Sequence, residues 1–292
     1  MSAASEWLYY KHFPWVYDNV TEDWLYLHGA SDGKIYAYRN SSKSWEEFSV
    51  PELTWEQKYE DWVLDPAPYG GLSVLQEIKD AKDSGSTELD LHGIRGTIIS
   101  DLSPLEKLTN LTQLILGMSW NIVDLSPLAE LTNLTKLDLY KGQISDLTPL
   151  AGLTNLTYLD LRDNNVTDLS PLENLTNLTW LDLSSNKITD YSALAKLTQL
   201  TELSLGGSGR SDPSANIVDL ADLHPLKQLT NLTKLSLWYV SHSSDFSQLA
   251  ELSDLTELTL HVSDGVSVSY ELSVAQKAII EEALPNTTIT YW

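Results

Sequence analysis

Two consecutive stretches decide the fold of this chain: LTYLDLRDNNVTDLSPLENLTN at residues 156–177 and LTWLDLSSNKITDYSALAKLTQ at residues 178–199. Both open with Leu-x-x-Leu-x-Leu, and the same anchor opens further copies whose first leucines are residues 111, 134, 200, 232 and 255. Successive first leucines are 23, 22, 22, 22, 32 and 23 residues apart, and residues 88–91 form an incomplete earlier copy. A fixed period of this length predicts a repeat architecture with about eight strands.

Each repeat divides into a strand and a returning segment. The leucines of the anchor are expected to point inward, and the residues between them outward, because side chains alternate along a strand. One repeat cannot cover its own leucines, so neighbouring repeats must stack around a continuous core. The returning segment carries proline at residues 104, 127, 149, 171 and 225. Proline disfavours a long α-helix there and predicts short 3₁₀ or helical turns.

This unit, Leu-x-x-Leu-x-Leu-x-x-Asn-x-Ile-x-Asp-Leu-x-Pro-Leu-x-x-Leu-Thr-Asn, resembles the leucine-rich repeats of the bacterial internalin type, which are close to those of a eukaryotic phosphatase regulator. The resemblance covers about residues 87–262. It implies an α/β solenoid with parallel strands on a concave face and short 3₁₀ or helical turns on a convex face. It also implies a non-catalytic scaffold that binds a protein partner on the concave face.

The repeats depart from this pattern in two ways. The asparagine that closes the turn is present as Asn164 and Asn186, whereas the third repeat has Gly142 there, and we expect Asn121 and Asn216 to be displaced equivalents. The sixth repeat is ten residues too long, mainly through residues 206–215. An insertion in a solenoid must leave it at a rim, so this segment is expected to be an exposed loop, either functional or a neutral surface insertion.

Aromatic residues are concentrated at the start of the chain, since residues 1–69 hold 16 of the 27. This change in composition predicts a boundary between modules. We expect an aromatic-rich β module at residues 1–50 and a short helix and linker at 51–70, with Pro51 in the first turn of that helix. Residues 71–86 would form a capping helix that buries Leu72, Leu75, Ile78 and Ala81. The repeats would fill residues 87–262, and residues 263–292 would form a C-terminal cap with a helix and a final strand.

The outward strand positions supply the candidate partner-binding residues, which are Tyr140, Tyr158, Asp160, Arg162, Trp180, Asp138 and Asp182. The three aspartates would form a row of carboxylates about 4.8 Å apart on neighbouring strands, partly neutralised by Lys136 and Arg162. Such a row could be a solvated acidic face, a protein-binding surface or a cation site. The outward aromatic side chains favour protein binding, because exposed aromatics are the usual anchors of interfaces. We therefore assign no metal site.

The N-terminal module has a shorter periodicity of aromatic strands separated by turn residues. It loosely resembles aromatic-rich repeat modules of bacterial surface proteins. Trp15, Tyr17, Trp24 and Tyr26 belong to strands that read as an antiparallel meander, with Trp and Tyr on one face of each strand. Their rings could stack on sugars, which would make the module a carbohydrate- or cell-wall-binding surface. Alternatively, they form the core of a small domain, and we favour this second interpretation.

Composition excludes several classes of function. With 18 Lys+Arg against 41 Asp+Glu, the formal charge is −23, which disfavours binding to nucleic acid and to anionic lipid. The chain has no cysteine. It also has no apolar run of about 18 residues that could span a membrane. Its first residues lack the pattern of a signal peptide, so we expect a cytoplasmic protein, or a secreted or cell-surface one if a leader was removed.

No motif for catalysis or for a cofactor is present: phosphate-binding loop, dinucleotide fingerprint, zinc-protease motif and nucleophile elbow are all missing. The six histidines show no ligand spacing. The sequence therefore predicts a monomeric, non-enzymatic scaffold without a cofactor, whose acidity favours a partner with a basic surface.

Overall fold

The computed structural model places the chain in two compact units, Met1–Gln57 and Lys58–Trp292, which are described separately. The residues that it describes are 7–8, 15–18, 23–29, 35–39, 43–47, 54–92, 98–118, 121–207, 220–241, 245–252, 254–263 and 271–291. Most of the insertion predicted at residues 206–215, together with Asn216, lies outside these ranges.

The first unit contains a five-stranded antiparallel sheet in which each strand pairs with the next along the chain. Its strands are β1 (Trp7–Leu8), β2 (Trp15–Asp18), β3 (Asp23–Gly29), β4 (Ile35–Arg39) and β5 (Ser44–Glu47). This arrangement confirms the predicted meander.

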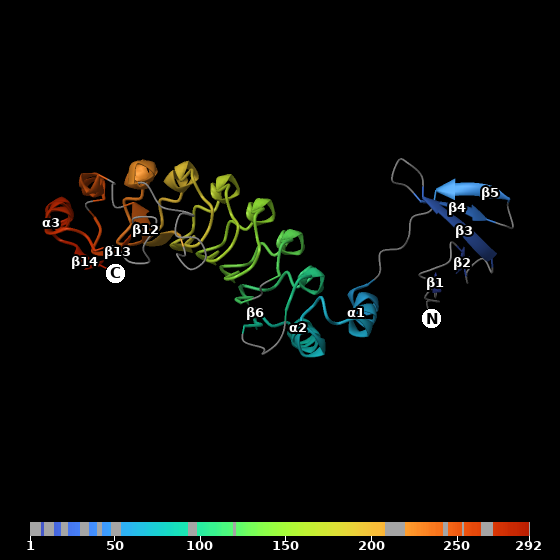
Figure 1. The fold of residues 1–292 in the computed structure, drawn as a ribbon. Coiled ribbons are helices and arrows are strands. Elements are labelled where there is room, and N and C mark those ends of the chain that lie inside the picture. Colours follow the sequence, from blue (N-terminus) through green and yellow to red (C-terminus); the bar gives the residue numbers. More distant parts are fainter. Residues whose placement is uncertain are drawn as a thin grey trace. The chain divides into compact units, whose positions relative to one another are not determined.

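The second unit is built on a nine-stranded parallel sheet whose strands follow one another in chain order. The strands are β6 (Glu88–Asp90), β7 (Gln113–Ile115), β8 (Lys136–Asp138), β9 (Tyr158–Asp160), β10 (Trp180–Asp182), β11 (Glu202–Gly206), β12 (Lys234–Ser241), β13 (Glu257–Ser263) and β14 (Thr288–Tyr291). The first eight are the predicted repeat strands, and β14 is added by the C-terminal segment. The strands line the inner side of a curve and the 3₁₀ helices line its outer side (Figure 1), as expected for a leucine-rich repeat solenoid.

The returning segments contain the predicted short turns. They are the 3₁₀ helices η1 (Ser103–Leu105), η2 (Ser126–Leu128), η3 (Thr148–Leu150), η4 (Ser170–Leu172), η5 (Ser192–Lys196), η6 (Leu220–Gln228) and η7 (Phe246–Glu251). Proline stands in the first turn of η1 to η4, where its missing N–H costs nothing. An aspartate two residues before each of these turns can accept a backbone N–H, as Asp168 does from Ser170 at 2.8 Å.

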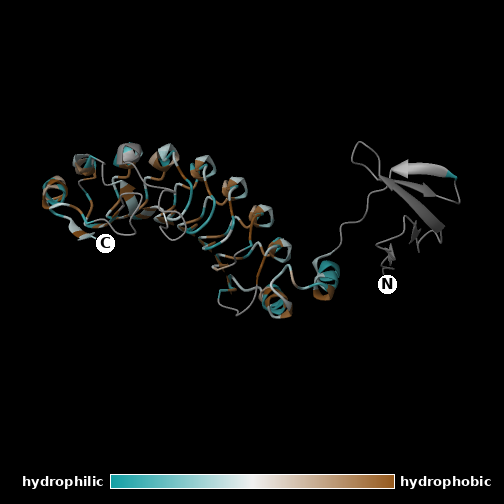
Figure 2. Cartoon of the chain, in the orientation of Figure 1, coloured by the Kyte–Doolittle hydropathy of each residue, from teal (hydrophilic) through white to brown (hydrophobic). Residues whose placement is uncertain are grey.

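The core lies between the sheet and the 3₁₀ helices, and apolar and polar stretches alternate in every turn of the solenoid (Figure 2). The central leucine of each repeat strand is buried, with Leu159 at 0% and Leu181 at 1% exposure. Aligned leucines on neighbouring strands stack directly, since the strands pair in register. Burial of such a side chain contributes roughly 1.5–3 kcal/mol, so the repeated leucines dominate the stability of the solenoid.

Hydrogen-bond ladders join each repeat to the one before it. The amide nitrogen of Asn164 donates to the backbone oxygens of Leu139 and Leu161, both at 3.0 Å, and its oxygen accepts from the N–H of Ile144 at 3.0 Å. Asn186 makes the equivalent bonds one repeat later. The expectation for Asn121 is wrong: it is exposed, and its side chain accepts from Gln143 at the surface. Asn121 directly precedes Ile122, as Asn165 precedes Val166, so it stands one residue past the ladder position and its side chain lies at the surface.

Helices lie at both ends of the solenoid. The first two are α1 (Trp55–Leu64) and α2 (Leu72–Ser84), and the third is α3 (Val274–Ala283), which opens with a capping box between Ser273 and Gln276. The buried face of α2 consists of Val74, Leu75, Ile78 and Ala81. Leu72 was expected there but is 55% exposed.

The prediction for Leu72 is wrong because it is the first residue of α2, where the side chain points away from the repeats. Helix α1 also begins later than expected. Gln57 donates its backbone N–H to the hydroxyl of Thr54, and Thr54 donates its own to the Gln57 side chain, which fixes the start at Trp55. Pro51 lies outside the described residues.

Candidate interaction surface

Three neighbouring strands, β8, β9 and β10, bring the candidate partner-binding residues together. They pair in register, so Lys136, Tyr158 and Trp180 form one row, and Asp138, Asp160 and Asp182 form the next. Two residues further along each chain segment stand Tyr140, Arg162 and Ser184. We call the group of Asp138, Tyr140, Tyr158, Asp160, Arg162, Trp180 and Asp182 the concave patch.

The aromatic pair of the first row is a direct result of strand spacing. The rings of Tyr158 and Trp180 stack with centroids 4.1 Å apart and planes inclined by 4°. On the other side of Tyr158, the ammonium of Lys136 lies 4.9 Å from the ring centroid. Strands about 4.8 Å apart hold flat side chains at stacking distance. Both faces of the tyrosine ring are therefore covered, and the two rings present their edges to the concave side.

Arg162 is held in one orientation by a carboxylate below it and a ring beside it. Its Nε lies 3.0 Å from both oxygens of Asp160, and its Nη2 lies 2.6 Å from Oδ2. Its Cζ lies 4.6 Å from the ring centroid of Tyr140. The hydrogen bond to Asp160 raises the pKa of Arg162 further. A fixed guanidinium loses little rotamer entropy when it binds a further group.

The row of aspartates is not a solvated acidic face, which was one of the three possibilities that the sequence left open. Asp160 is 0% exposed and Asp182 is 6% exposed. Alternation correctly turns these side chains away from the leucine core, but the longer side chains of the rows on either side enclose them. The carboxylates thus lie beneath the surface formed by the rings and Arg162.

The pKa of the Asp182 carboxyl group is raised above its ordinary value. Its Oδ1 accepts from the backbone N–H of Ser184 at 2.9 Å and from the Ser184 hydroxyl at 2.6 Å, and its Oδ2 lies 3.5 Å from Nε of Arg162. Burial outweighs these interactions and raises the pKa of Asp182 to about 6. The carboxyl therefore changes charge just below neutral pH.

Asp138 is more accessible than the other two carboxylates. Its neighbour on the preceding repeat is Gly117, and a Cβ built there would lie 3.2 Å from Oδ1 of Asp138 and 3.3 Å from Cδ2 of His92. The Asp138 carboxylate and the His92 ring thus take up the space that a side chain at position 117 would need, and Asp138 itself is half-buried. Burial still raises its pKa.

The phenol of Tyr158 stays protonated over the whole physiological range. Burial is the largest cause and the charge of Asp160 the next, and together with smaller contributions they raise its pKa to about 12. Neither this hydroxyl nor the indole N–H of Trp180 donates a hydrogen bond to any described residue. Both are therefore donors that a partner can use.

Two lysines belong to the surface although they were not among the candidate residues. Lys136 covers Tyr158, and Lys141 lies with its Nζ 5.0 Å from the ring centroid of Tyr140. The position of Lys136 beside Tyr158 could be predicted from the sequence, since the two residues align in the repeat. Lys141 was not, because it occupies a left-handed turn with φ 62° after β8, where the alternation of strand side chains no longer applies.

The concave face changes character beyond β10. Lys234 lies between Glu202 at 3.5 Å and Glu257 at 3.6 Å, so its charge is shared by two neighbouring strands. At the end of β11, Gly206 has φ 104°, and a Cβ there would lie 1.8 Å from the backbone oxygen of Trp238. The close approach of the two strands requires glycine at this position.

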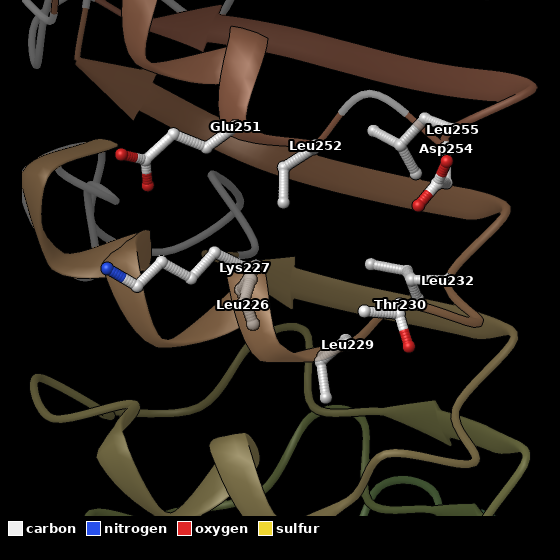
Figure 3. Close-up of a pocket in the computed structure, with 9 residues that line it drawn as sticks. All are labelled: Leu226, Lys227, Leu229, Thr230, Leu232, Glu251, Leu252, Asp254 and Leu255. Carbon is white, nitrogen blue, oxygen red and sulfur yellow. The ribbon is translucent and has the colours of Figure 1, made fainter.

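One small pocket lies on the convex side, between η6 and η7 (Figure 3). Its volume is about 30 Å³, which is room for about two water molecules. The residues that line it are Leu226, Lys227, Leu229, Thr230, Leu232, Glu251, Leu252, Asp254 and Leu255. It is too small for an organic ligand and shares no residue with the concave patch.

The four candidate glycan-binding residues lie in the first unit, on β2 and β3. The strand register sets Trp15 opposite Tyr26 and Tyr17 opposite Trp24. Among the described residues, no group of His, Asp and Glu side chains could hold a metal ion. No described helix combines the length and the apolar character that crossing a bilayer requires.

The repeats match known families in both sequence and structure. The family patterns "Leucine Rich Repeat" and "Leucine Rich repeats (2 copies)" match residues 155–175 and 176–217. The structure is similar to that of internalin C2 from Listeria monocytogenes str. 4b F2365, with a TM-score of 0.58 and 30% identity, over 80% of this chain and 96% of that chain. This chain belongs to the internalin family of leucine-rich repeat proteins.

Other solved structures agree with the internalin assignment. Internalin InlF of the same strain gives a TM-score of 0.52 and 32% identity over 67% of this chain, which spans 51% of the InlF chain. A leucine-rich repeat protein of Leptospira interrogans shares the fold, with a TM-score of 0.52 at 22% identity. No curated protein sequence matches significantly.

Proposed function

We propose that this internalin-family chain is a non-catalytic scaffold that binds a protein partner through the concave patch. The observation that carries the proposal is the stacked pair of Tyr158 and Trp180 beside the fixed Arg162. Aromatic residues and arginine are enriched among the residues that dominate binding energy at protein interfaces. All three side chains are partly exposed and held by their neighbours, so a partner would meet a surface that is already ordered.

The pattern of donors supports a protein ligand. Tyr158 and Trp180 offer an O–H and an N–H at their ring edges, while their stacked faces are occupied by each other and, for Tyr158, by Lys136. Stacking on a flat ligand would need a ring face, which the tyrosine does not offer. Backbone and side-chain acceptors of a protein segment could instead meet the edges.

Partner capture tests this function. The Tyr158→Ala/Trp180→Ala variant of the full chain is expected to lose at least tenfold in affinity for captured proteins, because truncating such anchors typically costs more than about 1.4 kcal/mol. The matched control is Ile98→Ala/Val123→Ala, which removes exposed apolar side chains away from the patch. Capture that is the same for both variants would refute the role of the concave patch.

The antiparallel module suggests a second function, binding of carbohydrate. The observation behind it is the cross-strand pairing of Trp15 with Tyr26 and of Tyr17 with Trp24 on β2 and β3. Retention of the full chain on cell-wall polysaccharide, compared with a Trp15→Ala/Trp24→Ala variant, tests it. Equal retention of the two proteins would exclude this function.

A further inference from the structure

In and beside the concave patch, the fully buried charges are negative, and the accessible charges are positive except for the half-buried Asp138. Asp160 and Asp182 are buried, whereas the side chain of Arg162 is 41% exposed. Lys136 and Lys141 are partly exposed beside the two tyrosine rings. Although the chain as a whole carries −23, most of the exposed groups here are cations and aromatic rings, with the half-buried Asp138 among them.

Arg162 keeps unused binding capacity. A guanidinium has five N–H donors. The hydrogen bonds of Arg162 to described residues use Nε and Nη2, which leaves both N–H groups of Nη1 for a ligand. With Asp160 fixing the orientation from below and Tyr140 from the side, these donors are presented without further ordering.

Lys136 is the second available cation. Its one described contact is with the face of the Tyr158 ring, so its ammonium keeps its three donors. Lys234 differs, since two glutamates already share its charge. Lys136 and Arg162 stand on adjacent strands and four positions apart in register, which separates their backbones by roughly 14 Å. Two carboxylates on an extended segment match that spacing.

We propose that the partner segment that binds the concave patch is acidic, with one carboxylate on Arg162 and another on Lys136, and that it crosses the edges of Tyr158 and Trp180 between them. This inference rests on the proposed function and replaces the basic partner that the composition of the chain predicted. The carboxylates that suggested a basic partner are committed to Arg162 and Ser184 within the protein. The half-buried Asp138 is directed at the backbone of Tyr140, from which it accepts an N–H at 3.0 Å.

A random dodecapeptide library displayed on phage is the probe, selected on the immobilised full chain. Peptides are kept when they bind the wild-type protein and do not bind Tyr158→Ala/Trp180→Ala. These patch-dependent peptides are expected to be enriched at least threefold in Asp and Glu over the unselected library. Synthetic peptides from this set are then measured with single variants.

Lys136→Met is expected to weaken an acidic patch-dependent peptide about tenfold, and Lys234→Met is expected to leave it unchanged. Arg162→Met should weaken it at least as much. Since that variant leaves Asp160 without its partner, Arg162→Gln/Asp160→Asn is measured alongside it. Substituting Gln for each Glu of the peptide should reproduce the loss on the wild-type protein.

The outcomes separate the two proposals. Patch-dependent peptides that are basic or neutral, or acidic peptides that bind Lys136→Met and Arg162→Gln/Asp160→Asn as tightly as wild type, would overturn the acidic partner and leave the concave patch as the binding surface. A selection that yields peptides with no dependence on Tyr158 and Trp180 would overturn both.

Discussion

Polar side chains are buried on both sides of the repeat strands, but they are stabilised in different ways. On the turn side, Asn164 and Asn186 satisfy backbone groups of their own and the preceding repeat, so each buried amide is neutral and fully bonded. On the concave side, the carboxyl groups of Asp160 and Asp182 are buried. Arg162 and Ser184 donate hydrogen bonds that offset the cost of removing these groups from water. The first arrangement occurs in the two repeats that carry the turn asparagine, and the second occurs on β9 and β10.

The difference separates residues that build the solenoid from residues that shape its concave surface. The side-chain amides of Asn164 and Asn186 lie in the interior, so they cannot contact a partner and do not affect which partner binds. The buried carboxylates fix an arginine at the surface, and they do so at a cost in stability. Substitutions on the two sides should therefore differ in size and, in one case, in sign.

The largest effect is expected for Asp160→Ala. The variant loses the hydrogen bonds that the buried carboxylate accepts from the backbone N–H and the guanidinium of Arg162. Hydrogen bonds to charged groups contribute about 1.5–3 kcal/mol each, and because Arg162 is 41% exposed and can be rehydrated, we expect a total loss of about 3–4 kcal/mol. Chemical denaturation at pH 7 measures the loss, with Glu130→Ala, an exposed carboxylate on the convex side, as the control. A loss similar to that of the control would show that Arg162 does not depend on Asp160.

Asn164→Ala tests the turn side. The N–H of Ile144 and the backbone oxygens of Leu139 and Leu161 would lose their partner in the interior. Buried groups left unsatisfied cost about 1–3 kcal/mol each, reduced where water enters, so a total loss of about 2–4 kcal/mol is expected. Asn174→Ala, at an exposed position, should be nearly neutral. Equal stability of the two variants would contradict the ladder as a source of stability.

Asp182→Asn is expected to change stability in the opposite direction. Burial raises the pKa of Asp182 from 3.8 to about 6, so the folded state holds its proton more tightly than the unfolded state does. The stability that this provides is complete below pH 4 and is lost as the pH rises through 6. One pKa unit corresponds to about 1.4 kcal/mol, so the neutral amide should stabilise the protein by roughly 2–3 kcal/mol at pH 8.

The Asp182→Asn measurement is a pair of unfolding curves at pH 5 and pH 8. The wild-type protein should lose more stability than the variant between these two values, because the variant lacks the titrating group. A variant that is less stable than wild type at pH 8 would mean that the ion pair with Arg162 outweighs the cost of burying the charge.

The smallest effect is expected for Lys234→Met. The lysine and its partners Glu202 and Glu257 are exposed to solvent, and such pairs add little to stability. Thermal denaturation in low and in high salt should give the same midpoint as wild type within experimental error. A clear salt-dependent loss would show that the concave charges act as a network across β11, β12 and β13.

The leucine repeat was enough to predict the solenoid, because it fixes which residues must be covered. The leucine spacing predicted the strands, and the prolines predicted the 3₁₀ turns. Asn164 and Asn186 indicated where the side-chain hydrogen bonds between repeats would form. Asn121 was misplaced because it stands one residue past the ladder position. Leu72 was misplaced because it is the first residue of α2 and lies off the buried face formed by Val74, Leu75, Ile78 and Ala81.

The character of the concave patch depends on contacts between neighbouring repeats. Alternation along a strand tells which way Asp160 and Asp182 point, but their burial depends on Tyr158, Trp180 and Arg162, which arrive from neighbouring repeats and adjacent rows. Stacking, charge neutralisation and exposure are properties of side chains that are far apart in sequence and meet across the sheet. That is why the composition of the chain predicted a basic partner, while the arrangement of its charges favours an acidic one.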